Sequence, residues 1–234
     1  MLLRKRVYIF GVFSALLFLI LTVYCMSVYP GGIVTDHYSV GYDFFKNYFS
    51  DLGRTHNFLG TSNFTSMLIF MTMVTLIGLA TIFYYITTPY FFSNTQLCRK
   101  LSVYGSIMGF ITGIGYIGIA FTPADLLLPM HLVFVQIAFN SFFVAVILYS
   151  IAIYKNPVYP NFYAYVYLMY ALVLGCYILI MLFGPSGRTP EGIGIQASSQ
   201  KMVVYSQILC MMIQAYGSWM LNNKIDKDRA TFVE

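Results

Sequence analysis

The sequence predicts an all-α, polytopic membrane protein with six transmembrane helices in one bundle. Of its 234 residues, 59% are hydrophobic and only 9% are charged, whereas a soluble domain carries about 25% charged residues. The mean hydropathy is +0.74. The charged residues lie in gaps between six apolar runs of 20 to 25 residues. As a helix, each run is long enough to cross a hydrocarbon core of about 30 Å.

The same composition excludes several classes of protein. So few charged residues cannot cover a water-facing surface, which excludes a soluble globular enzyme, and so many apolar residues exclude a disordered chain. The formal net charge is +5. The Lys and Arg residues are scattered between the apolar runs instead of being gathered on one face, so we expect no nucleic-acid partner.

The six runs are expected to be helices because backbone polar groups in lipid must be satisfied within their own segment. Together they form one domain over residues 1–234. In chain order, the helices are predicted over residues 7–29, 66–87, 101–122, 130–154, 162–184 and 202–221.

The first helix follows a basic segment, Arg4–Arg6, as the apolar part of a signal peptide would. Its run is longer than the roughly 7–15 residues of a signal peptide, so we expect an uncleaved helix. Residues 30–65 then form a long outer loop. Within this loop, the aromatic and charged segment Tyr42–Phe49 predicts a short helix at the membrane interface.

The later connections are shorter. Residues 88–100 link the second and third helices, and Pro157 and Pro160 stop the fourth. Residues 185–200 are rich in Gly, Ser and Pro and predict a last outer loop. Residues 222–234 are polar and predict a loose tail.

The Lys and Arg residues indicate the orientation. One set of connections and termini holds nine of them and the other set holds four. Because positive residues gather on the cytoplasmic side, both termini are predicted to be cytoplasmic. We expect a multi-pass protein of the plasma or another cell membrane.

A stripe of small residues marks the third helix. Gly105, Gly109 and Gly113 recur every four residues, a spacing that lets helix backbones approach closely. The stripe predicts either packing within the chain or a face for a second copy or a partner membrane protein.

Polar residues mark two other helices. Gln207, Gln214 and Ser218 fall on one stripe of the sixth helix, and Gln136 and Asn140 form a one-turn pair in the fourth. Such side chains face the bundle or a wet cavity more readily than lipid. Structural hydrogen bonding and a path for a substrate both explain them.

The charged and polar residues outside the runs predict one cluster at the outer face. Partly buried carboxylates beside Arg or His are plausible acid, base or headgroup-binding groups. We assign candidate catalytic roles to Asp51, Asp125 and His131. Candidate ligand-binding residues are Ser50, Arg54, Arg188, Glu191, Lys201 and Gln207.

Structural roles explain the same residues. Ser50 and Asp51 can close a turn with Gly53 in a left-handed conformation, and Arg54 can pair with Asp51. Asp125 can cap the helix that follows it. Both interpretations stay open on the sequence alone.

A metal site is the most specific version of the outer cluster. His37, His56 and His131 could supply zinc ligands together with nearby carboxylates. The histidines lack a short ligand spacing, and the sequence names no cofactor.

Two short motifs resemble a known family. The run Asn47-Tyr48-Phe49-Ser50-Asp51-Leu52-Gly53, followed by Asn57 and Asn63, resembles the six-helix membrane proteins catalogued as domain of unknown function 998. Thr122-Pro123-Ala124-Asp125 with His131 is similar to that family's element between helices three and four. The resemblance implies a six-helix fold and an outer polar face, without a known reaction.

The resemblance extends to residues 192–201, which are similar to that family's last outer segment. There Gln200-Lys201 stands where a polar-basic pair enters the sixth helix, and Gln200 is not acidic. The Ser50-Asp51 pair after a long first loop also resembles the Frag1/DRAM/Sfk1 group, which is linked to lipid handling.

Two functions from different classes follow. The first is binding or processing of a lipid or amphiphile at the outer face, with membrane lipids as partners. The second is a non-enzymatic scaffold or complex subunit. A transporter is disfavoured because no charged side chain lies near the middle of a run.

Overall fold

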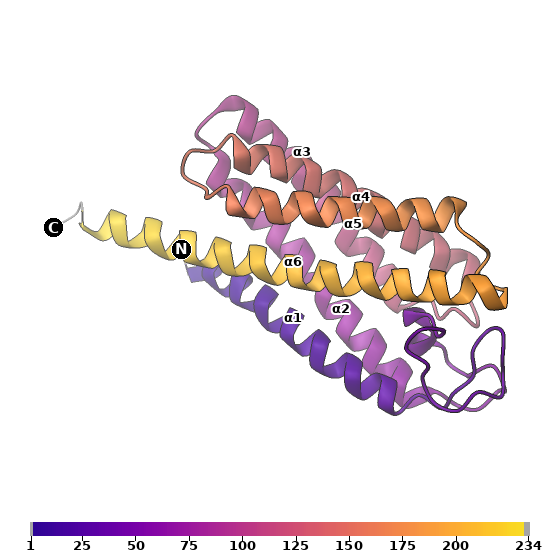
Figure 1. Cartoon of the computed structure of the whole chain (residues 1–234). Coiled ribbons are helices and arrows are strands. Elements are labelled where there is room, and N and C mark those ends of the chain that lie inside the picture. The colour runs from indigo at the N-terminus through magenta and orange to yellow at the C-terminus, as the bar shows by residue number, and fades with distance from the viewer. Residues whose placement is uncertain (1, 232–234) are drawn as a thin grey trace.

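The computed structural model describes residues 2–231, and this part of the chain is helical apart from its connections (Figure 1). The predicted all-α class is confirmed. The elements are α1 (Leu2–Ser27), η1 (Phe49–Gly53), α2 (Phe64–Thr87), η2 (Thr88–Phe92), α3 (Gln96–Ala120), α4 (Leu128–Tyr154), α5 (Phe162–Phe183) and α6 (Pro190–Thr231), where η denotes a short 3₁₀ helix.

The six long helices pack in chain order. Each contacts the next one along the sequence, and α6 closes the ring by packing against α1. Both termini lie at the same end of the bundle (Figure 1), which we call the terminal end. The opposite end, the loop end, carries the connections 28–63, 121–127 and 184–189.

Five helices in the described chain are long and apolar enough to cross a membrane, namely α1 to α5, with η2 continuing α2. The chain is therefore a multi-pass membrane protein. The apolar part of α6 contains Gln207, Gln214 and Ser218, which lower its mean hydropathy. These side chains are buried and bonded inside the bundle, to the Tyr116 hydroxyl, the Tyr163 carbonyl and the Tyr159 hydroxyl respectively.

The helices extend beyond the apolar runs at several ends. The third begins at Gln96 instead of residue 101, because the Thr95 side chain accepts a hydrogen bond from the Cys98 amide at 3.1 Å and caps it. The sixth begins at Pro190 instead of residue 202. Proline is tolerated in the first turn of a helix, and Ile193, Ala197 and Lys201 are buried at four-residue steps.

The sequence prediction for residues 185–200 and 222–234 was therefore wrong in part. Packing of the 193/197/201 face outweighs the weak helix propensity of Gly192 and Gly194. Beyond the apolar run, Asn222 is buried, accepts a hydrogen bond from Arg4 and donates one to Asp226. α6 thus continues through the first part of the predicted tail to Thr231, and residues 232–234 of that prediction lie outside the described residues.

The prediction of a short helix over Tyr42–Phe49 was also wrong, because this segment forms turns. Asp43 accepts hydrogen bonds from the Phe45 and Lys46 amides, and the Asn47 side chain accepts one from the Asp43 amide. These side-chain bonds favour turns over helix. Within the first loop, only Phe49–Gly53 forms a short helix, which begins at the last residue of that segment. Gly53 does not adopt a left-handed conformation, whereas Gly31 does, with φ of +106°.

The small-residue stripe of α3 packs inside the chain. A Cβ atom at Gly105, Gly109 or Gly113 would overlap Tyr149, Tyr85 or Ile82 respectively, and these belong to α4 and α2. The stripe is thus filled by the protein's own helices. A second copy or partner protein cannot contact this face without displacing them.

Candidate functional site

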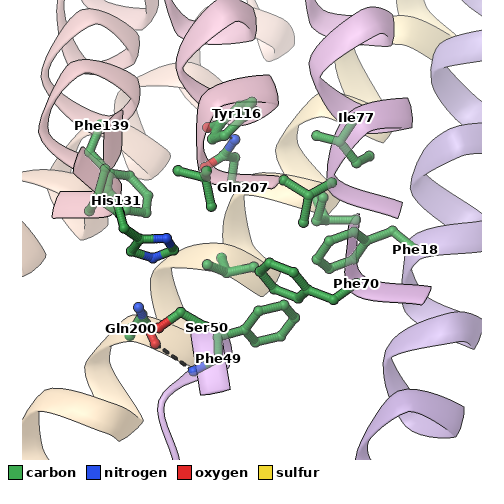
Figure 2. A pocket seen from close by; sticks show the side chains of 15 residues that line it. Phe18, Phe49, Ser50, Phe70, Ile77, Tyr116, His131, Phe139, Gln200 and Gln207 are labelled. Atoms are coloured by element: carbon green, nitrogen blue, oxygen red, sulfur yellow. Dashed lines mark hydrogen bonds between the residues drawn. The ribbon is translucent and has the colours of Figure 1, made fainter. Parts of the chain in front are cut away.

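The bundle contains a partly open cavity of about 70 Å³ in its loop-end half (Figure 2). Five of the six long helices contribute to its walls, and η1 covers its loop end. The lining residues are Phe18, Phe49, Ser50, Phe70, Val74, Ile77, Tyr116, Ile119, His131, Val135, Phe139, Gln200, Val204, Gln207 and Ile208.

Most of these walls are apolar, and the polar groups lie in two places. Gln207 and Tyr116 sit together away from η1 (Figure 2). The Gln207 side chain donates a hydrogen bond to the Tyr116 hydroxyl and accepts one from the Tyr170 hydroxyl at 3.1 Å. These groups already satisfy one another, so they stabilise the bundle more than they offer contacts to a ligand.

The second polar group lies beside η1, where His131, Ser50 and Gln200 line the cavity (Figure 2). His131 is 3% exposed. Its Nδ1 lies 2.7 Å from the Thr122 carbonyl oxygen, which can only accept, so Nδ1 carries the proton. In the neutral ring, Nε2 is then a hydrogen-bond acceptor.

η1 is held over the cavity by two consecutive residues of α6. The Gln200 Oε1 atom accepts a hydrogen bond from the Phe49 amide at 2.6 Å. The Lys201 ammonium donates to the carbonyl oxygens of Asn47 and Ala197. Although Lys201 is only 1% exposed, its charge is thus met by carbonyl dipoles, and burial lowers its pKa to about 8.

Asp51 lies behind this cover and does not line the cavity. It accepts hydrogen bonds from the Asn47 side chain at 3.0 Å and from the Tyr48 amide at 2.8 Å. Burial raises the pKa of its carboxyl to about 6, even though these hydrogen bonds and the charges of Arg54 and Lys201 act in the opposite direction. Asn47, Asp51, Gln200 and Lys201 form what we call the cap cluster.

Asp125 ties two connections together. It accepts hydrogen bonds from the backbone amides of Thr55 and His56 and from the Thr55 hydroxyl. Burial alone would raise the pKa of this carboxyl, but these hydrogen bonds outweigh it and the pKa is lowered. Asp125 therefore stabilises the first loop and does not cap α4, which corrects the structural role expected for it.

The structure separates the remaining candidates from the cavity. The Arg54 guanidinium lies over the Phe58 ring at 4.0 Å and donates to the His56 carbonyl. Arg54 forms no ion pair with Asp51 within the described residues. Arg188 and Glu191 are exposed near the start of α6. None of the three lines the cavity.

The histidines do not converge. His37 stacks on Phe58, His56 contacts the Thr55 hydroxyl and His131 lines the cavity. Within residues 2–231, no group of three or more His, Cys, Asp or Glu side chains is placed to hold a metal ion. The metal site considered from the sequence therefore has no geometric support.

Comparison of the chain with protein-family models, with curated proteins and with solved structures finds no match. The resemblance to the domain of unknown function 998 thus stays a prediction.

Proposed function

We propose that the protein binds an uncharged amphiphile, with an apolar end in the cavity and a polar group beside His131. In this proposal α6 is a sixth transmembrane helix, both termini are cytoplasmic and the loop end faces outward. The observation that supports the proposal is an apolar cavity inside the bundle with a neutral acceptor, the His131 Nε2 atom, near its loop end.

The size of the cavity limits the ligand. A cavity of about 150 Å³ holds benzene, and this one has about 70 Å³. It accommodates the end of one alkyl chain as it stands. A larger apolar group requires the residues around the cavity to move apart.

The chemistry of the walls selects the polar group. Ser50 and Gln200 are uncharged, and the charged side chains of Asp51 and Lys201 point to other partners. Placing an ion in this apolar space without a counter-charge is strongly unfavourable. A hydroxyl group fits, because it donates to His131 Nε2 and accepts from the Ser50 hydroxyl.

We assign His131 to binding and not to catalysis. In the described chain, no hydrogen bond or ion pair joins any two of Asp51, Asp125 and His131. Neither carboxylate is thus placed to orient or activate His131 as the base of a catalytic pair. The carboxylates instead stabilise the first loop through its backbone.

The test is a thermal-shift titration of the purified protein in lipid nanodiscs. The probes are monolaurin, which has an uncharged glycerol group, and dodecyl phosphate, which has the same chain and an anionic group. At 100 times its Kd a ligand stabilises by about 2.7 kcal/mol, which corresponds to an increase in Tm of about 5 to 10 °C. Monolaurin is expected to raise Tm and dodecyl phosphate is not.

Two valines of α4 supply a matched pair of variants. Val135 lines the cavity and is 7% exposed. Val133, two residues earlier, lies on the opposite side of the helix and is 49% exposed. Val135→Phe fills the cavity and should abolish the shift, and Val133→Phe should preserve it. Equal shifts in both variants, or a stronger effect of dodecyl phosphate, would refute the proposed site.

A further inference from the structure

One face of α4 carries an exposed stripe along its whole length. Steps of three and four residues alternate between its members, as they do between the core positions of a two-stranded coiled coil. The stripe comprises Met130, Val133, Ile137, Asn140, Val144, Ile147, Ile151 and Tyr154, all of them exposed. We call it the α4 seam.

The apolar members of the seam alone do not indicate a partner, because any helix at the edge of a membrane bundle presents such a face to lipid. Asn140 is different. It lies 12 residues after Leu128 and 14 before Tyr154, so at 1.5 Å per residue it sits near the middle of the span. An amide exposed to hydrocarbon at this depth is unfavourable unless its polar atoms are paired.

Asn140 is only partly paired within its own chain. Its Nδ2 atom donates to the backbone carbonyl and to the Oε1 atom of Gln136, at 2.8 and 2.9 Å. These contacts use both amide hydrogens. Within residues 2–231, no hydrogen bond reaches its Oδ1 atom.

We propose that the α4 seam binds the α4 seam of a second copy of this chain. Copies inserted with the same topology hold Asn140 at the same depth, so a two-fold axis along the membrane normal brings the two residues together. An amide carries both donors and an acceptor, so the two Asn140 side chains can pair when one Nδ2 hydrogen of each moves from the Gln136 Oε1 atom to the Oδ1 atom of the other copy.

The apolar seam residues fit this arrangement. Five of them are Val or Ile, which give the seam an apolar surface, and a single Asn at a core position specifies the register and the oligomeric state. The α3 glycine stripe cannot serve instead, because it is filled within the chain. The seam lies outside the cavity, so this inference does not depend on the proposed ligand.

The experiment measures proximity in native membranes. In a Cys176→Ser background, Ile137→Cys on the seam should form a disulfide-linked dimer on mild oxidation. Leu172→Cys, on the exposed face of α5 at 59% exposure, is the matched control and should not. Equal cross-linking at the two positions would overturn the proposal.

The role of Asn140 is tested by energy transfer between labelled copies in vesicles at increasing protein density. Asn140→Leu should weaken association about 3- to 30-fold, the range for one interhelical hydrogen bond in a membrane, and Asn140→Gln should restore most of it. Thr72→Leu removes another exposed polar group, on α2, and should have no effect.

Two results would refute the proposed contact between the α4 seams of two copies. One is a monomeric wild-type protein at every density, and the other is an Asn140→Leu protein that associates like the wild type. If Asn140→Leu fails to fold, the cross-linking comparison still decides. A second polypeptide cross-linked to Ile137→Cys in place of the second copy would also overturn the proposal.

Discussion

Asp51 allows a quantitative test of the cap cluster. The carboxyl is 4% exposed, and burial raises its pKa to about 6 from the ordinary 3.8. The folded protein therefore binds this proton more tightly than the unfolded chain does. The difference of about two pH units corresponds to about 3 kcal/mol of folding free energy.

The sign of the pH dependence follows. The stabilisation is fully present below pH 3.8, where Asp51 is protonated in both states, and it is lost as the pH rises through about 6. In the wild-type protein, unfolding should thus become easier between pH 4 and pH 7. Asp51→Asn has no carboxyl to ionise, so its stability should lack this component.

The assay is thermal unfolding followed by circular dichroism at 222 nm in nanodiscs at a series of pH values. The difference in Tm between Asp51→Asn and wild type should increase by about 6 to 12 °C from pH 4 to pH 7. Asp43→Asn removes a more exposed carboxylate from the same loop and serves as the control. Parallel pH profiles of Asp51→Asn and wild type would show that Asp51 is not buried as described.

Three further predictions concern residues that hold the bundle and its loops. Gly109→Ala places a Cβ in the Tyr85 ring and should lower the free energy of unfolding, measured by denaturation, by about 1–3 kcal/mol. Gly194 has open space around it, so Gly194→Ala should raise the free energy of unfolding by up to about 1 kcal/mol. Asp125→Ala removes the acceptor for Thr55 and His56, so proteinase K should cut within residues 54–62 faster than in wild type or in Asp36→Ala. Lys201→Met leaves the Asn47 carbonyl without its donor and should lower the free energy of unfolding by about 1–3 kcal/mol at pH 7. Lys46→Met removes an exposed lysine and should cause no measurable change. Equal effects of the two variants would contradict the role of Lys201.

The membrane-spanning helices were predictable because the absence of charge is a property of each segment alone. The ends of the helices were not predictable, because a helix can continue beyond its apolar run into segments that contain charged residues. Residues 96–100 continue α3 up to its Thr95 cap, and Pro190 starts α6 well before the apolar run. In the first loop, the aromatic residues indicated a helix, whereas the hydrogen bonds of Asp43 and Asn47 decide for turns.

The candidate site was predictable only where it is polar. Ser50, His131 and Gln207 stood out in the sequence, and all three line the cavity. The apolar walls could not be found, because Val133 and Val135 are the same residue type and only tertiary packing decides which of them is buried. The contact between Thr55 and Asp125 spans 70 residues, and no local pattern signals it.

The cap cluster also sets an order of events during biosynthesis. Gln200 and Lys201 follow the loop residues they bind, Phe49 and Asn47, by 151 and 154 positions. The first loop therefore gains these two contacts only after the last helix has been made. A chain that stops before residue 200 would hold this loop through Asp125 and the start of α2, but without the two bonds that keep η1 over the cavity.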